Sequence, residues 1–230
     1  SAASDVYKRQ GNHLMLQQIE DRLKEHHPPT NEFVTNRASV LIPLSMHRGE
    51  PSLLLTRRSA KLRSFSGHVS FPGGKRDQED KSNYCTSLRE SREEVGLEQE
   101  QIRFMGELEQ MLSPHGCLVS PFVARIPNQF EPKINEAEIE SCFWVPISFF
   151  LDPKQHQLRQ HHEKRPYPHF THHFYFKDYH IWGMTALMIL RLLELGLGHQ
   201  SIHPLHHPRA PHWIVAAQNH RETTLNPSVA

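Results

Sequence analysis

Cysteine and long apolar runs are both scarce in this sequence. The three cysteines, Cys85, Cys117 and Cys142, are an odd number at irregular spacings, and no CxxC pair occurs. This pattern argues against a disulfide framework or a cysteine zinc site, and it fits a reducing cytoplasm. The chain shows no basic start followed by an apolar run and a cleavage site, so we expect no secretory signal. The most apolar stretch, Met184 to Leu195, is too short and too charged for a membrane span.

Net charge is also nearly absent, with 26 Lys and Arg against 25 Asp and Glu in 230 residues. Without a general basic field, nucleic acid is not an expected partner. A composition of 37% hydrophobic and 22% charged residues is ordinary for one globular domain. We expect that domain over residues 13–198. Residues 1–12 lack periodicity and are expected to be a disordered or non-native tail, and the His- and Pro-rich residues 199–230 a poorly ordered one.

Acidic residues are missing from Pro51 to Arg76, where six residues are basic: Arg57, Arg58, Lys61, Arg63, Lys75 and Arg76. The same segment contains the turn Phe71 to Gly74. Gly73 and Gly74 permit a positive φ and a close approach of the backbone, which phosphate-binding loops require. The basic residues and the glycine turn together predict an anion site between Pro51 and Arg76.

The next stretch is acidic and predicts a helix from Ser82 to Val95 that stops at Gly96. Helical spacing brings Glu90, Glu93 and Glu94 onto one edge, opposite an apolar stripe of Tyr84, Leu88 and Val95. Carboxylates at a helix C-terminus are disfavoured by about 0.3 to 1 kcal/mol each, so something should compensate. A solvated face relieved by Arg89 and Arg92 is one explanation. A magnesium or manganese site for a phosphate substrate is the other.

The sequence RESREEVGL, from Arg89 to Leu97, resembles the second half of the signature of Nudix hydrolases. Arg89, Glu90, Glu93, Glu94 and Gly96 match, and Ser91 replaces an aliphatic residue. The first half departs from the signature, because Gly74 fits only with a loop one residue longer, which leaves Asp80 at the position of a glutamate.

The segment upstream is similar to a second signature, the one found in coenzyme A diphosphatases. Eleven fixed positions match over twenty-one residues: Leu54, Leu55, Thr56, Arg58, Ser59, Arg63, Gly67, Phe71, Pro72, Gly73 and Gly74. This family also has the longer loop and an Asp before the helix. A looser resemblance extends from Ala38 to Ala186.

Several flanking elements can be predicted from periodicity. His13 to Glu25 has the spacing of an amphipathic helix, and Ala38 to Leu44 with Leu53 to Thr56 predicts a hairpin. Two further strands are expected at Ile102 to Met111 and Leu118 to Ile126. Glu107 and Glu109 lie in the first of them and could reach a metal, but a solvent-facing position is at least as consistent with strand alternation.

Outside the helix, Glu138 occupies the position of a glutamate that the coenzyme A diphosphatases have before an FxVP stretch. We take Glu138 as the candidate general base, with a surface role as the alternative. The histidines between His156 and His180 flank a predicted strand, Phe170 to Tyr179. They contain no HExxH pattern, so we do not predict a metal site there.

The resemblance implies a Nudix fold, an α/β (α+β) architecture with a mixed sheet between helices. It also implies hydrolysis of the diphosphate of coenzyme A or an acyl derivative, with magnesium or manganese held by Glu90, Glu93 and Glu94. Arg58 and Arg63 would bind the anionic substrate with Gly73 and Gly74, and Arg89 would orient the helix glutamates. A Nudix hydrolase of ADP-ribose or a nucleoside triphosphate, and a non-catalytic binder of adenine nucleotides, are the alternatives.

Overall fold

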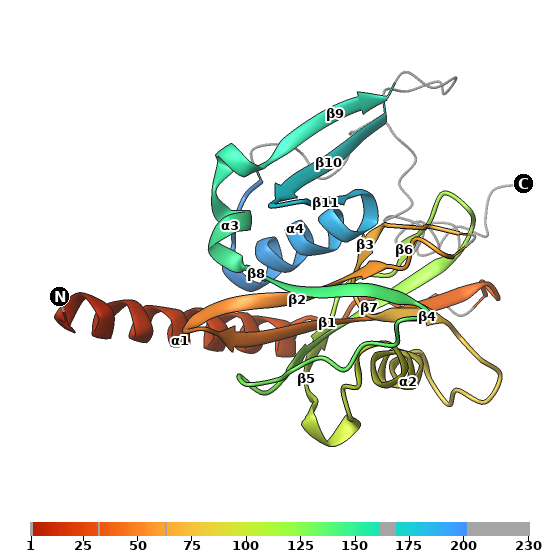
Figure 1. Cartoon of the computed structure of the whole chain (residues 1–230), viewed down its shortest axis with the longest axis horizontal. Helices are drawn as coiled ribbons and strands as arrows, with labels where there is room; N and C mark the ends of the chain where they lie inside the picture. The colour runs from red at the N-terminus through yellow and green to blue at the C-terminus, as the bar shows by residue number, and fades with distance from the viewer. Residues whose placement is uncertain (1, 32, 63, 162–168, 202–230) are drawn as a thin grey trace, which may run out of the picture.

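The computed structural model describes residues 2–31, 33–62, 64–161 and 169–201. The chain forms a large mixed sheet with helices on both faces and a smaller sheet beside it (Figure 1). The helical elements are α1 (Ala2–Glu25), α2 (Asn83–Val95), η1 (Gln99–Gln101), α3 (Ile147–Leu151), η2 (Pro153–Gln155) and α4 (Gly183–Leu197). The strands are β1 (Arg37–His47), β2 (Glu50–Arg58), β3 (Val69–Ser70), β4 (Gly73–Lys75), β5 (Arg103–Glu107), β6 (Met111–Leu112), β7 (Leu118–Arg125), β8 (Ile139–Pro146), β9 (Gln157–His161), β10 (His169–Phe176) and β11 (Tyr179–Trp182). The predicted fold class is confirmed.

Strand β1 is the centre of the large sheet. It pairs antiparallel with β2 and β4 and parallel with β7. Strand β2 also pairs with β3 and β8, and β7 also pairs with β5 and β6. Because the start of β1 pairs with β4, the two glycines of the predicted anion site are fixed against the middle of the sheet.

The predicted hairpin of β1 and β2 is confirmed. Its closing pair is His47 with Glu50, and the two residues between them, Arg48 and Gly49, have φ angles of 49° and 83°. Positive φ at both central residues is the geometry of a two-residue turn whose twist matches that of the strands. A tight turn of this kind fixes the register of β2, and with it the side on which each later residue of β2 lies.

The alternation of β2 separates two cores. Leu53 and Leu55 belong to the larger core with residues of α1 and α4, whereas Leu54 belongs to the smaller core with Val95 at the end of α2. Neighbouring residues of a strand point to opposite faces, so α2 covers one face of the sheet and α1 and α4 the other. Helix α2 is therefore held beside β1, β4 and β7 (Figure 1).

The second sheet has the order β11-β10-β9 and is an unpredicted part of the fold. A single strand was expected from Phe170 to Tyr179, but the chain turns between Phe176 and Tyr179, where Lys177 has a φ of 52°. The turn sends β11 back along β10. As a result β11 lies beside β3 of the large sheet.

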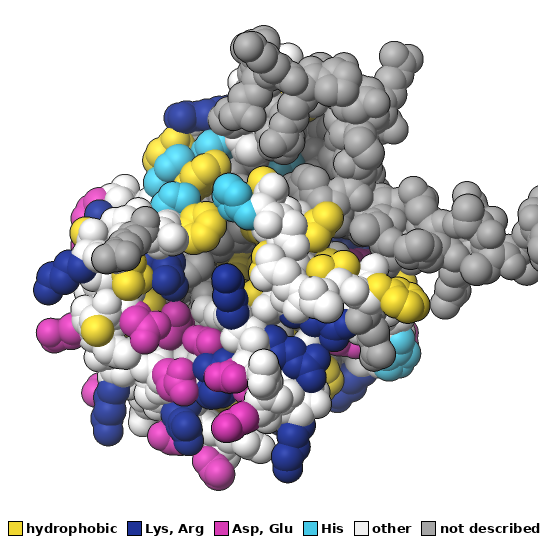
Figure 2. Space-filling view, turned by 90° about the vertical axis from the view of Figure 1, so that its right-hand side faces the viewer, with side chains coloured by type: hydrophobic (Ala, Val, Ile, Leu, Met, Phe, Trp, Pro, Cys, Tyr) yellow, Lys and Arg dark blue, Asp and Glu magenta, His cyan; other side chains and the backbone are white. Residues whose placement is uncertain are grey.

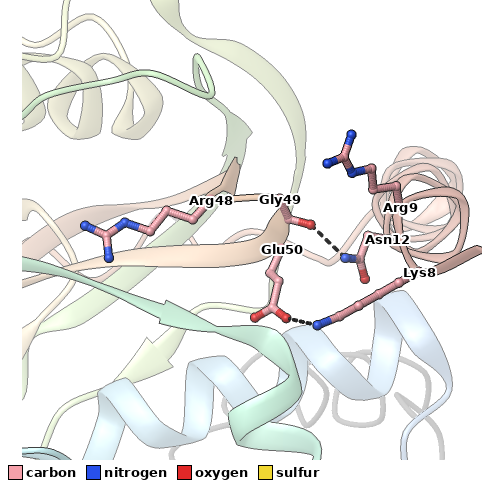
Figure 3. A pocket seen from close by; sticks show the side chains of 6 residues that line it. All are labelled: Lys8, Arg9, Asn12, Arg48, Gly49 and Glu50. Atoms are coloured by element: carbon pink, nitrogen blue, oxygen red, sulfur yellow. Dashed lines mark hydrogen bonds and ion pairs between the residues drawn. The ribbon is translucent and has the colours of Figure 1, made fainter. Parts of the chain in front are cut away.

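Helix α1 is longer than expected, because it begins at Ala2 and not at His13. The prediction of a tail over residues 1–12 rested on missing apolar periodicity, and the contacts here are polar. Asn12 donates to the carbonyl of Gly49 at 2.8 Å, and the Lys8 ammonium lies 2.6 Å from a Glu50 carboxylate oxygen (Figure 3). These two contacts tie α1 to the turn of the hairpin.

The hollow between α1 and this turn has a volume of about 290 Å³. The guanidinium groups of Arg9 and Arg48 on its rim point in different directions, so they do not form an anion site (Figure 3). Of the predicted tail at residues 199–230, positions 202–230 lie outside the described residues. In the part of the chain that the structure describes, no helix is both long and apolar enough to cross a membrane.

The early start of α1 can be tested at Gly11, which is an exposed position in the helix with no atom within 4 Å of an added Cβ. Gly11→Ala should raise the free energy of unfolding by about 1 kcal/mol, because Ala has the higher helix propensity. Urea unfolding measures the change. Gly49→Ala is the matched control, since its Cβ also enters open space but its φ is 83°, so it should destabilise. A neutral or destabilising Gly11→Ala would show that the helix does not continue through this position.

Candidate active site

Helix α2 begins and ends where the sequence predicts. The Ser82 side chain accepts a hydrogen bond from the Cys85 amide at its start, and Gly96 adopts the left-handed conformation at its end, with a φ of 68°. Ser91, which interrupts the apolar stripe, is buried and donates its hydroxyl to the carbonyl of Ser87 at 2.7 Å. A buried hydroxyl is tolerated when it is hydrogen-bonded, so the departure from an aliphatic residue does not distort the helix.

Glu94 is the most buried of the predicted carboxylates, with 2% of its side chain exposed. One of its oxygens accepts the backbone N–H of Gly73 at 3.0 Å, and the other lies 3.6 Å from a guanidinium nitrogen of Arg58. The pKa of Glu94 is raised to about 8, chiefly by burial and also by the carboxylates of Glu90 and Glu138, against the opposing effects of Gly73 and Arg58. The helix and the basic segment therefore meet at this carboxylate.

The two glycines of β4 are required by close contacts of two kinds. A Cβ on Gly73 would lie 2.3 Å from the carbonyl oxygen of Ser39 in β1, and one on Gly74 would lie 2.5 Å from the carboxylate of Glu90. Gly73 thus allows β4 to approach the sheet, and Gly74 leaves room for a side chain of α2. This arrangement places backbone of the predicted anion loop directly over the helix carboxylates.

Glu138, the predicted general base, precedes β8 and lies within electrostatic reach of Glu90 and Glu94. Its charge contributes to the raised pKa of both carboxyl groups, after burial, which is the largest cause in each case. Asn135 donates to the Glu138 carboxylate at 3.3 Å, and the Ser59 amide donates to the Glu138 carbonyl at 2.7 Å. Three carboxylates from two distant segments are therefore neighbours.

Arg89 connects most of the remaining site residues. Its guanidinium donates to Glu90 at 2.9 Å, to Glu93 at 3.1 Å and to the carbonyl of Lys75 at 3.1 Å. Two of its nitrogens also donate to the two carboxylate oxygens of Asp80, at 3.1 and 3.0 Å. This bidentate contact lowers the pKa of Asp80 to about 2. The sequence predicted that Arg89 orients the helix glutamates, but it gave Asp80 no partner.

The remaining predicted residues lie in different surroundings from Glu94. Glu93 is 45% exposed and bound to Arg89, whereas Arg63 lies outside the described residues. Glu109 forms an ion pair with Arg191 of α4, with a 2.9 Å contact to its Nε, and is thereby tied to the helix layer. Glu107 is half-buried, and burial raises its pKa.

A divalent cation fits this site by its donor chemistry. Glu90, Glu93 and Glu94 supply only oxygen atoms, which Mg²⁺ and Mn²⁺ prefer, and the repulsion among these carboxylates is only partly offset by Arg58 and Arg89. Within the described residues, no three Asp, Glu, His or Cys side chains already surround a common point at ligand distance. The fit is therefore one of donor chemistry.

A family model described as the NUDIX domain matches residues 35–178. The chain belongs to the NUDIX family. Among curated relatives of this NUDIX protein, the "Uncharacterized Nudix hydrolase NudL" of Photorhabdus laumondii is 38% identical over 169 residues, which cover 73% of this chain and 89% of the relative. "Nudix hydrolase 15, mitochondrial" of Arabidopsis thaliana is 36% identical over 167 residues, covering 70% of this chain and 59% of the relative.

Solved NUDIX structures are also similar. A NUDIX hydrolase from Alicyclobacillus acidocaldarius is 17% identical, with a TM-score of 0.45 over 74% of this chain and 98% of the other. The NUDIX domain of NrtR from Shewanella oneidensis, solved with ADP ribose, is 19% identical, with a TM-score of 0.40 over 56% of this chain and 84% of the other. Membership of the NUDIX family supports a diphosphate hydrolase, and enzymes of this family generally use divalent metal ions.

The Asp80–Arg89 contact predicts a stability effect. Asp80→Asn replaces a carboxylate that is 7% exposed and leaves a guanidinium facing a neutral amide, so we expect a loss of about 1 to 3 kcal/mol in unfolding free energy. Thermal and urea unfolding check this. Asp77→Asn is the control, because the exposed carboxylate of Asp77 accepts a hydrogen bond from the neighbouring amide of Gln78 and pairs with no arginine in the described part of the chain. Equal effects of the two changes would contradict a special role for Asp80.

The two glycines should separate fold from activity. Gly74→Ala meets only the end of the flexible Glu90 side chain, so stability should change by less than about 1 kcal/mol while displacement of Glu90 lowers turnover of a nucleoside diphosphate derivative by about a hundredfold. Gly73→Ala meets the backbone of Ser39 and should cost about 1 to 3 kcal/mol of stability. Melting curves and initial rates distinguish them. Wild-type turnover in a folded Gly74→Ala variant would show that the position of the Glu90 carboxylate does not affect catalysis.

Proposed function

We propose that this NUDIX enzyme hydrolyses the diphosphate of coenzyme A or its acyl derivatives, giving adenosine 3',5'-bisphosphate and 4'-phosphopantetheine. The observation that supports this most is the position of the second signature. Two of its fixed positions, Arg58 and Gly73, both contact the buried carboxylate of Glu94. The segment that resembles coenzyme A diphosphatases therefore lies against the carboxylates that belong to the NUDIX signature.

Arg58 is suited to binding the anionic substrate. Its Nε atom is buried and has no hydrogen-bond partner in the described part of the protein. A buried donor without a partner is costly, and a phosphate oxygen would satisfy it. Together with the glycines of β4, Arg58 would orient the diphosphate over α2. Arg63, which lies outside the described residues, is proposed as the second arginine of this anion site.

The carboxylates have separate proposed tasks. A divalent magnesium or manganese ion held by Glu90, Glu93 and Glu94 would neutralise the diphosphate oxygens and acidify water. Glu138 would accept a proton from the attacking water as the P–O bond of the anhydride breaks. Arg89 would position Glu90 and Glu93 without touching the substrate, because its guanidinium is already occupied by Asp80 and the Lys75 carbonyl.

The products of the reaction test this proposal. The protein with Mg²⁺ or Mn²⁺ should convert coenzyme A into equimolar adenosine 3',5'-bisphosphate and 4'-phosphopantetheine, as measured by chromatography, and Glu94→Gln should abolish the reaction. ADP-ribose is the comparison substrate. Faster cleavage of ADP-ribose would favour another NUDIX specificity. Nucleotide binding without hydrolysis of either compound would favour a non-catalytic adenine-nucleotide binder.

The two arginines predict a loss of catalytic efficiency. A lysine cannot replace a bidentate guanidinium contact with phosphate, so Arg58→Lys and Arg63→Lys should each lower kcat/KM for coenzyme A by about tenfold. Steady-state kinetics measures this, with Arg48→Lys at the far hairpin turn as the control.

The position of each arginine follows from a second substrate, 3'-dephospho-coenzyme A. An arginine that binds the 3'-phosphate should lose its effect on this substrate, whereas one that binds the diphosphate should retain it. Wild-type kcat/KM in both lysine variants on both substrates would remove the arginines from the substrate site.

A further inference from the structure

An aromatic row extends from the basic loop to the second sheet. The Phe65 ring contacts the His68 ring edge to face at 5.6 Å, and the His68 ring contacts that of Trp182 at 5.5 Å. We propose that this row, defined as Phe65, His68 and Trp182, binds the purine base of the substrate by stacking. The proposal rests on the proposed function only in requiring an adenine nucleotide as the ligand.

Phe65 is an unusual residue for the position it occupies. Its side chain is 53% exposed, and its φ of 55° is in the left-handed region that bulky residues avoid. None of the fixed positions of the signature falls on Phe65, so the resemblance assigns it no role. Strain at an exposed aromatic residue in a substrate loop is a reason to look for function. The ring also contacts His115 at 5.8 Å, which supports it from the loop before β7.

The other end of the row is held rigidly. Trp182 ends β11, and its ring is stacked with His173 at 5.8 Å and an interplanar angle of 7°. At the start of α4, Thr185 donates its hydroxyl to the carbonyl of Val69, next to His68, at 3.0 Å. Helix α4, which directly follows Trp182, is thereby tied to β3, and β11 itself also lies beside β3.

The row begins beside the diphosphate site. The amide of Arg58 donates to the carbonyl of His68 at 2.9 Å, so these two residues form the base of the loop that bears Phe65. Arg58 also lies 3.6 Å from Glu94. A nucleotide whose phosphates contact Arg58 would therefore carry its base toward His68 and Phe65. Figure 2 shows one face of the molecule on which histidine and hydrophobic side chains gather above intermingled acidic and basic ones.

The chemistry of the row favours a planar heterocycle over a flexible chain. Aromatic and imidazole rings bind bases through their π-faces, whereas a pantetheine arm would need amide hydrogen-bonding partners. The row contains three ring systems and, in Phe65, no polar group. A purine base can continue such a stack at Phe65 without displacing any contact within it.

The test is a binding measurement that does not require turnover. Calorimetric titration of the full chain with Mg²⁺ uses α,β-methylene-ADP, which resists cleavage between its phosphates, and methylenediphosphonate, which lacks the base. Phe65→Leu and Trp182→Leu should each raise the Kd for α,β-methylene-ADP by about tenfold and leave the Kd for methylenediphosphonate unchanged. Trp144→Leu is the matched control, because Trp144 also stacks on a histidine, His47 at 4.7 Å, at the opposite end of the hairpin. Its Kd values should equal those of the wild type.

A second readout protects the test against misfolding of the Trp182 variant. With Trp144 and Trp213 replaced by Phe, Trp182 is the only tryptophan, and α,β-methylene-ADP should change its fluorescence. An unchanged Kd for α,β-methylene-ADP in Phe65→Leu overturns the proposal. An equal rise in the Kd for methylenediphosphonate also overturns it, because Phe65 would then support the phosphate-binding loop and not the base. The probe is not coenzyme A, so this binding result stands whether or not the protein hydrolyses coenzyme A. Failure of the inference and failure of the proposed function can therefore be told apart.

Discussion

The hydrogen bond from the Gly73 amide to the Glu94 carboxylate is the contact on which the site depends. It joins the basic loop to the acidic helix across the sheet, at 3.0 Å and in a nearly water-free position. Gly73 can reach Glu94 only because it has no Cβ to strike β1, and Glu94 is buried only because α2 is pressed onto the sheet by Val95 and Leu97. The carboxylate therefore remains in the interior at an electrostatic cost that a bound cation would lower.

The sequence predicted those features that depend on local chemistry. Ser82 and Gly96 define the ends of α2, and the register of the β1–β2 hairpin follows from a turn of two residues. Glu138 was reached only through resemblance, because its approach to Glu94 depends on the pairing of β2 with β8, where Arg58 lies opposite Ile139. Periodicity within one segment cannot predict a contact with a residue so distant along the chain.

Two elements differ from the prediction for reasons that hydrophobic periodicity does not record. The first half of α1 lacks an apolar stripe because its contacts with the hairpin turn are a hydrogen bond from Asn12 and an ion pair from Lys8. The break between β10 and β11 occurs at Lys177, whose positive φ nothing in its side chain predicts. Hydrophobic periodicity registers burial, so elements held by polar contacts or broken by backbone geometry escape it.

Arg57 and Arg58 show what strand alternation does to two identical neighbours. Arg58 points to the α2 face and contacts Glu94, whereas Arg57 points to the other face, where its guanidinium lies over the ring of Tyr179 at 5.8 Å. The signature fixes the second arginine and leaves the first position free, and the sheet explains why. Deleting one residue between the turn and Thr56 would exchange the two environments, so the sequence would keep its Arg-Arg pair but Arg57 would face Glu94 in place of Arg58.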